Sequence, residues 1–206
     1  MNLRGPAAPI MVAAVAVIAY ATSLTGTFHF DDLPTILRNP AIQDPGNLDD
    51  VFVDPDLFSG EPGNRMYRPI LLSTYLANHA IAGFDPVAWH LTNVLLHALC
   101  ALLVVRLAGR LLEHFGVVET GLASLLAGLT FALHPVHSEA VNYISARSGV
   151  IATAGVLGAL LCHLAFRRAE GPPKRRGLWL AASLSLFALA LGGKEIAVAF
   201  VPAVFA

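Results

Sequence analysis

Long apolar stretches are the feature that most constrains how this chain can fold. A helix needs about 20 consecutive, mostly apolar residues to cross the hydrocarbon core of a bilayer. We interpret five stretches as spans, several of them short: Pro9–Thr25, Ala88–Ala108, Gly121–His134, Val150–Phe166 and Leu178–Gly192. A sixth apolar stretch, Ile196–Ala206, stops at the end of the chain. The pattern predicts an all-α fold, a polytopic membrane helix bundle of five full spans and a truncated sixth.

The composition agrees with a membrane protein and excludes other classes. Of the 206 residues, 56% are hydrophobic and 13% are charged, whereas about 25% of the residues in an average soluble domain are charged. The formal net charge is −1, so there is no basic excess to displace counterions from a nucleic acid, and none is expected as a partner. Cys100 and Cys162 lie inside apolar stretches, which argues against a disulfide framework.

Basic residues set the expected orientation, because lysine and arginine are retained on the cytoplasmic side of a membrane. The loop between the fourth and fifth spans carries Arg167, Arg168, Lys174, Arg175 and Arg176. We therefore expect that loop and the N-terminus in the cytoplasm, and the segment 27–87 outside. A cleavable signal peptide is the alternative for the first span, because Arg4, an apolar core and Ala19-Tyr20-Ala21 together resemble one.

The segment 27–87 is the most polar part of the chain and is the expected first extracytoplasmic loop. Its early part carries turn signals such as Asp44-Pro45-Gly46-Asn47. Further on, Pro69 precedes the apolar run Ile70–Ala82, and Gly83 follows it. A proline in the first turn and a glycine just past the end are typical of a helix. Because the run is too short to span, we expect a helix that lies on the outer membrane surface.

Two adjacent carboxylates, Asp31 and Asp32, follow the first span directly. At the mouth of a helix bundle, such a pair is a candidate for a general base. The alternative is a solvated loop start in which an aspartate caps the next helical turn. The Asp-x-Pro spacing of this segment favours that alternative.

A second group of candidates begins where the third span emerges, at His134-Pro135-Val136-His137-Ser138-Glu139. We expect a helix here with Glu139, Tyr143 and Arg147 on one face, because they are spaced at i, i+4 and i+8. The two histidines could also be read as metal ligands. Two histidines and one carboxylate are weak support for a metal, however, and no metal is predicted.

Polar residues in or beside the other spans complete the set of candidates. Three of them fall on one stripe of the second span: His90, Asn93 and His97. Such a stripe is expected to face the interior of the bundle, either at a site or, as we prefer for His97, in hydrogen bonds between helices. Lys194 ends the fifth span and either reaches to the interface or joins Arg68 and Arg147 in holding a phosphate. All these groups are expected on the outer face.

Taken in order, these motifs resemble the transmembrane and tetratricopeptide-repeat (TMTC) protein O-mannosyltransferases and their bacterial relatives, which are polytopic glycosyltransferases of the GT-C superfamily. The resemblance rests on Phe30-Asp31-Asp32, Asn39-Pro40, Tyr67-Arg68-Pro69, Trp89–His97, Phe131–Val141, Arg147 and Gly193-Lys194-Glu195. It covers nearly the whole chain. Because the family continues into further spans and tetratricopeptide repeats, residues 1–206 are expected to be the N-terminal part of a larger membrane protein.

The resemblance implies an enzyme that moves a sugar, mannose in the named relatives, from a polyprenyl-phosphate donor to a protein hydroxyl or another acceptor such as a glycan. It implies inversion at the sugar, with Asp31 as the base and Asp32 shaping the local charge or binding the acceptor. The implied substrate-binding residues are Arg68, His90, His137, Glu139, Arg147 and Lys194. No cofactor is expected. The alanine-rich composition and the excess of arginine over lysine suggest a bacterial inner membrane, with the site facing the periplasm. A non-catalytic scaffold, a transporter of lipid-linked sugars and an inactive fragment are the alternatives.

Overall fold

The computed structural model describes residues 7–170 and 172–205, and within them every regular element is a helix. The longer helices are α1 (Ala7–Ala19), α2 (Pro69–Ala82), α3 (Pro86–His114), α4 (Thr120–Leu133), α6 (Arg147–Arg168) and α7 (Pro173–Gly193). The shorter ones are α5 (His137–Asn142), α8 (Phe200–Phe205), η1 (Ala21–Thr25), η2 (Leu33–Leu37), η3 (Pro40–Gln43), η4 (Pro45–Leu48), η5 (Asp50–Phe52), η6 (Pro55–Phe58), η7 (Ile144–Ala146) and η8 (Glu195–Ala199). The predicted all-α polytopic bundle is confirmed.

Four helical segments of the described chain are long and apolar enough to cross a membrane: Ala7–Thr25, Pro86–His114, Ile144–Arg168 and Pro173–Gly193. Each coincides with one of the predicted spans. The remaining prediction, Gly121–His134, coincides with α4, an apolar helix of 14 residues. At 1.5 Å per residue α4 is about 21 Å long, which is less than the roughly 30 Å of a hydrocarbon core.

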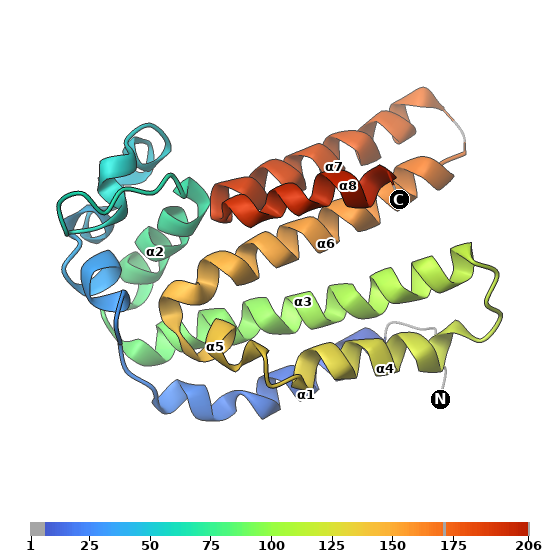
Figure 1. Cartoon of the computed structure of the whole chain (residues 1–206), viewed down its shortest axis with the longest axis horizontal. Helices are drawn as coiled ribbons and strands as arrows, with labels where there is room; N and C mark the ends of the chain where they lie inside the picture. The colour runs from blue at the N-terminus through green and yellow to red at the C-terminus, as the bar shows by residue number, and fades with distance from the viewer. Residues whose placement is uncertain (1–6, 171, 206) are drawn as a thin grey trace.

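The helices pack as two groups that meet at α3 (Figure 1). In the first group, α1 and α4 lie against α3 around Val12, Ala101 and Val105. In the second group, α6 lies along α7 and also contacts α3. Gly155 on α6 permits this close approach, because a Cβ there would come within 2.7 Å of the Cβ of Ala190 on α7. Small residues at such contacts are typical of helices that associate in membranes.

The two ends of the bundle are built from different elements. At one end, here called the loop end, α1 finishes, the segment 26–68 and α2 lie, and α3 and α6 begin (Figure 1). At the opposite end, here called the arginine end, α3 and α6 finish and α4 and α7 begin. The predicted site residues all belong to elements of the loop end: Asp31, Asp32, Arg68, His90, His137, Glu139, Arg147 and Lys194.

Single-turn helices fill much of the segment 26–68, where the sequence predicts turns. Asn39, Asp44 and Asp54 each precede a proline, and each side chain accepts a hydrogen bond from the backbone N–H two residues further on. An Asn or Asp side chain thus begins each of these turns, as it does in Asx-turns generally. The buried apolar side chains of this segment pack against α2: Ile36, Ile42, Val51 and Phe58.

The helix predicted over Ile70–Ala82 is confirmed as α2, with Pro69 as its first residue and Gly83 just past its end. Gly83 has a φ of 56°, which glycine adopts without steric strain. One face of α2 is buried against the rest of the loop end through Leu71, Leu72, Tyr75 and Leu76.

The prediction of one helix with Glu139, Tyr143 and Arg147 on a shared face is wrong. Helix α5 ends at Asn142, Tyr143 is extended with a φ of −98° and a ψ of 116°, and α6 begins at Arg147. Glu139 is exposed, whereas Arg147 is fully buried. A spacing of i, i+4 and i+8 predicts a shared face only where the helix is continuous.

Candidate active site

Asp32 is buried at the loop end, with 1% of its surface exposed. Its Oδ1 accepts hydrogen bonds from the backbone N–H of Ser145 at 2.8 Å and from the Ser145 hydroxyl at 2.5 Å. Its Oδ2 accepts the backbone N–H of His29 at 3.0 Å. Although Asp32 directly precedes η2, its side chain makes no capping hydrogen bond there. The carboxylate instead joins the segment after α1 to the connection between α5 and α6.

Asp31, the neighbouring residue, is exposed. Its backbone N–H donates to the Tyr143 hydroxyl at 2.8 Å, and its carbonyl oxygen accepts the Thr35 hydroxyl at 2.5 Å. These bonds fix the backbone of Asp31. Burial, with a further contribution from the carboxylates of Asp31 and Asp32, raises the pKa of Tyr143 to about 12. The Tyr143 hydroxyl therefore stays protonated beside Asp31 at neutral pH.

Phe30 adds an aromatic surface next to these carboxylates. Its φ of 47° lies in the left-handed region, which a bulky residue rarely adopts. The residue is 84% exposed, and its ring meets the Tyr143 ring edge-on, with the centroids 6.3 Å apart. Strained backbone of this kind is concentrated at ligand sites. An exposed ring beside Asp31 offers a face on which a sugar ring or an acceptor side chain can pack.

Arg147 is fully buried, and all three nitrogens of its guanidinium group donate hydrogen bonds within the protein. Nε donates to Oδ1 of Asn93 at 2.7 Å, and Nη1 donates to Oδ1 of Asn78 at 2.8 Å. Nη2 donates to the carbonyl oxygen of Trp89 at 3.0 Å. The guanidinium also lies over the rings of Tyr75 and Trp89, at 5.2 and 5.3 Å from their centroids. In this structure Arg147 therefore holds α2, α3 and α6 together and does not reach a surface where a phosphate could bind.

The predicted inward stripe on α3 is confirmed, because His90, Asn93 and His97 are each at most 2% exposed. Nδ2 of Asn93 donates to the carbonyl oxygen of Tyr143 at 3.2 Å, and Nε2 of His97 lies 3.1 Å from the carbonyl oxygen of Ala132. His97 therefore forms a hydrogen bond between α3 and α4, which is the role that we preferred over catalysis. The ring of His90 packs against Gly26, where a Cβ would come within 2.6 Å of its Nε2.

His137 is half-buried near the start of α5. Its ring centroid lies 4.3 Å from that of Phe131 and 5.2 Å from that of His97. Burial lowers the pKa of His137, and the neighbouring His97 and His134 lower it further. These surroundings favour the neutral ring. Within the described residues, no group of three or more His, Cys, Asp or Glu side chains is arranged to hold a metal ion.

Arg68 and Lys194 lie where α2 meets the end of α7. Nη2 of Arg68 is 3.1 Å from both carboxylate oxygens of Glu195, so its charge is already paired. Lys194 is half-buried and makes no ion pair with any described residue. Among the residues that the structure describes, no hydrogen bond or ion pair joins Arg68 or Lys194 to Asp31. Glu139 is exposed on α5 and forms no ion pair with Arg68 or Lys194 within the described residues.

Comparison with known proteins identifies relatives of the chain. It is 32% identical to the human protein O-mannosyl-transferase TMTC4, over 91% of this chain and 27% of that protein. It is 31% identical to the Mus musculus protein O-mannosyl-transferase TMTC2, over 84% of this chain and 20% of that protein. It is 29% identical to the Caenorhabditis elegans protein O-mannosyl-transferase F38B6.6, over 75% of this chain and 22% of that protein. The chain is homologous to the TMTC protein O-mannosyl-transferases.

This homology confirms the family resemblance that the motifs predict. The chain spans only 20% to 27% of the length of these three curated TMTC relatives. No protein-family model matches the chain. No solved structure matches it.

In this homologue of the TMTC transferases, Asp32 and Arg147 each bind a residue that the sequence analysis did not single out. Ser145 binds the Asp32 carboxylate, and Asn78 binds the Arg147 guanidinium. Neither residue belongs to a recognisable motif. The one available signal was the polarity of Asn78 in a mostly apolar helix that also carries Ser73, Thr74 and His79, because a polar side chain among apolar ones needs a partner.

Proposed function

We propose that the loop end is the active site of a membrane glycosyltransferase, which moves mannose or another sugar from a polyprenyl-phosphate donor to a hydroxyl of a protein or other acceptor. The names of the homologues, protein O-mannosyl-transferases, support the transfer of a sugar. The basic loops of the arginine end support a cytoplasmic N-terminus and a site on the opposite side of the membrane. In a bacterium this side would be the periplasm.

The observation that carries the proposal is the difference between the two aspartates. Both oxygens of Asp32 accept hydrogen bonds in a buried position, whereas Asp31 is exposed beside Phe30 and Tyr143. In the proposed reaction, Asp31 takes the proton from the acceptor hydroxyl as that oxygen attacks the anomeric carbon of the sugar. The bond from the anomeric carbon to the phosphate oxygen breaks, polyprenyl phosphate leaves, and the configuration inverts. Asp32 positions Asp31 by holding the backbone next to it.

Departure of the phosphate develops negative charge that a cation must stabilise. Lys194 is our first candidate, because its ammonium group forms no salt bridge with a described residue, whereas the carboxylate of its neighbour Glu195 is paired with Arg68. Arg68 is the second candidate, and it would exchange Glu195 for the phosphate. Arg147 maintains the shape of the site in this proposal and does not contact the substrate.

The substitution Asp31→Asn tests the proposal. The chain is reconstituted in vesicles with a polyprenyl-phosphate mannose donor and a peptide acceptor that contains serine and threonine. Loss of the base is expected to lower transfer about 10²- to 10⁴-fold, while the yield of folded protein stays the same. Asp50→Asn, at an exposed aspartate of η5 in the same segment, is the matched control and is expected to keep full activity. Transfer that survives in Asp31→Asn, or a wild-type chain that transfers no mannose, contradicts the proposal.

A further inference from the structure

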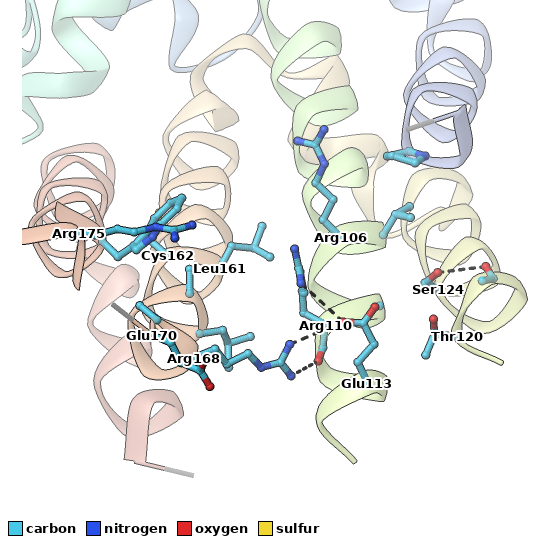
Figure 2. A pocket seen from close by; sticks show the side chains of 18 residues that line it. Arg106, Arg110, Glu113, Thr120, Ser124, Leu161, Cys162, Arg168, Glu170 and Arg175 are labelled. Carbon is cyan, nitrogen blue, oxygen red and sulfur yellow. Dashed lines mark hydrogen bonds and ion pairs between the residues drawn. The ribbon is translucent and has the colours of Figure 1, made fainter. Parts of the chain in front are cut away.

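The arginine end contains a pocket with a volume of about 770 Å³, lined by residues of α1, α3, α4, α6 and α7 (Figure 2). Pockets that bind drug-sized molecules have volumes of about 300–1,000 Å³. Part of the lining is apolar, with Leu161, Leu164 and Trp179 contributed by α6 and α7. The pocket lies at the end of the bundle opposite Asp31, so it is separate from the proposed active site.

Positive charge is concentrated in this pocket. Its charged lining residues are Arg106, Arg110, Arg168, Arg175, Glu113 and Glu170. Four arginines against two glutamates give a formal net charge of +2, whereas the whole chain has −1. The pocket is therefore suited to a ligand that carries negative charge.

The four arginines differ in how they are neutralised. Arg168, at the end of α6, donates to the carbonyl oxygen of Arg110 on α3 at 2.8 Å. Arg110 and Arg168 share one carboxylate oxygen of Glu113, at 3.7 and 3.6 Å, and Figure 2 shows Arg168 reaching across to α3. The side chains of Arg106 and Arg175 make no hydrogen bond or ion pair within the part of the chain that the structure describes. These two guanidinium groups are available to an external anion.

The position of the pocket indicates the source of that anion. Arg110 lies near the end of α3, Arg168 is the last residue of α6, and Arg175 lies in the first turn of α7. Where helices of this length span a bilayer, their ends lie at the level of the lipid head groups. Basic pockets between transmembrane helices are places where anionic head groups bind. An apolar wall beside the arginines suits a molecule that also carries acyl chains.

We propose that this pocket binds an anionic phospholipid. Arg106 and Arg175, on opposite walls of the pocket (Figure 2), supply the positive charge that attracts its phosphodiester group, since guanidinium groups form strong hydrogen bonds with phosphate oxygens. Its acyl chains lie along Leu161, Leu164 and Trp179. The lipid would fill the space between α3 and α6, which diverge toward this end (Figure 1), and so would link the two groups of helices.

The test measures the binding of phosphatidylglycerol to the purified chain in a non-ionic detergent. Phosphatidylcholine and inorganic phosphate are the comparison probes. We expect phosphatidylglycerol to bind at least about tenfold more tightly than phosphatidylcholine, because two arginines act on the net charge of the lipid. Inorganic phosphate is expected not to compete at millimolar concentrations, because it has no acyl chains.

Substitutions then locate the binding. The double variant Arg106→Gln with Arg175→Gln is expected to bind phosphatidylglycerol about 10- to 30-fold more weakly. Arg175→Gln alone, at the exposed beginning of α7, is expected to bind phosphatidylglycerol about fivefold more weakly. The matched control is Arg167→Gln with Lys174→Gln, which removes two exposed basic residues of the same end that do not line the pocket.

The control variant is expected to bind as the wild type does. Three results overturn the proposal: equal binding of the two lipids, displacement of the lipid by inorganic phosphate, or unchanged binding in the pocket variants. An equal loss in the control variant also overturns it, because the attraction would then be a general property of the basic surface.

Discussion

Arginine has opposite surroundings at the two ends of this bundle. At the loop end, Arg147 is fully buried and donates to Asn93, Asn78 and the backbone of Trp89. At the arginine end, Arg106 and Arg175 line a pocket, and their guanidinium groups have no partner within the described residues. A buried charge without compensating partners costs several kcal/mol, so the partners of Arg147 are part of the folded structure itself. The exposed arginines have no such requirement and can bind an ion from outside.

The same contrast separates two neighbours in the sequence, Asp31 and Asp32. Asp32 is buried and fully hydrogen-bonded, whereas Asp31 is exposed. In both comparisons, the buried side chain stabilises the fold, whereas the exposed side chains are available for chemistry or binding. The chemical type of a residue therefore indicates little about its role until its burial and its partners are known.

The largest expected effect on stability is that of Arg147→Met. The change leaves the side-chain oxygens of Asn93 and Asn78 and the carbonyl oxygen of Trp89 buried without their donor. Each such group costs about 1–3 kcal/mol, so we expect a loss of about 3 kcal/mol or more in the free energy of unfolding. Thermal unfolding in detergent, followed by the fraction of monodisperse protein, measures this loss. A melting temperature equal to that of the wild type would show that Arg147 is not needed for the fold.

Asp32→Asn is expected to have the next largest effect. The amide keeps one acceptor oxygen but presents an N–H group to one of the donors that now bind the carboxylate, His29 or Ser145. Hydrogen bonds to a charged group contribute about 1.5–3 kcal/mol, which is the expected loss. Asp31→Asn is the matched control. Because Asp31 is exposed, this substitution is expected to change the free energy of unfolding by no more than about 0.5 kcal/mol. Equal losses in the two variants would remove the distinction between the aspartates.

A smaller, pH-dependent effect is expected from His137. Because burial lowers its pKa below the ordinary 6.5, the unfolded chain binds a proton at a higher pH than the folded chain does. Stability is therefore unaffected above about pH 6.5 and falls as the pH drops from there toward the folded pKa. His137→Gln is expected to make the unfolding curve between pH 7.5 and pH 5 flatter. His114→Gln, at an exposed histidine of the arginine end, is expected to follow the wild type; if it flattens the curve equally, the effect does not belong to His137.

The smallest effect is expected from Arg106→Gln in lipid-free detergent. The side chain is exposed and has no partner in the described chain, so the free energy of unfolding is expected to change by no more than about 0.5 kcal/mol. The same thermal unfolding assay measures it beside Arg147→Met. A loss of stability as large as that of Arg147→Met would mean that arginines at the two ends of the bundle contribute equally to the stability of the fold.

The positions of the helices could be predicted from the sequence, because the signals for them are local. Four predicted spans coincide with helices long enough to cross a membrane, since backbone groups in a bilayer must form hydrogen bonds within their own segment. Pro69 and Gly83 bracket α2, and the stripe of His90, Asn93 and His97 faces inward as its spacing predicts. The break after Asn142 could not be predicted in this way, because nothing in the local sequence there excludes a continuous helix.

The sequence by itself determined that this chain is a helical membrane bundle with polar candidates near one end. Only the tertiary structure decided which of those candidates are free. Asp31 and Asp32 are identical side chains one position apart, and Asp32 becomes the buried one because Ser145, 113 residues away, binds it. Arg147 is enclosed by hydrogen-bond partners from α2 and α3 that lie 54 to 73 residues away. Such contacts form only when distant segments pack together, so no local spacing encodes them.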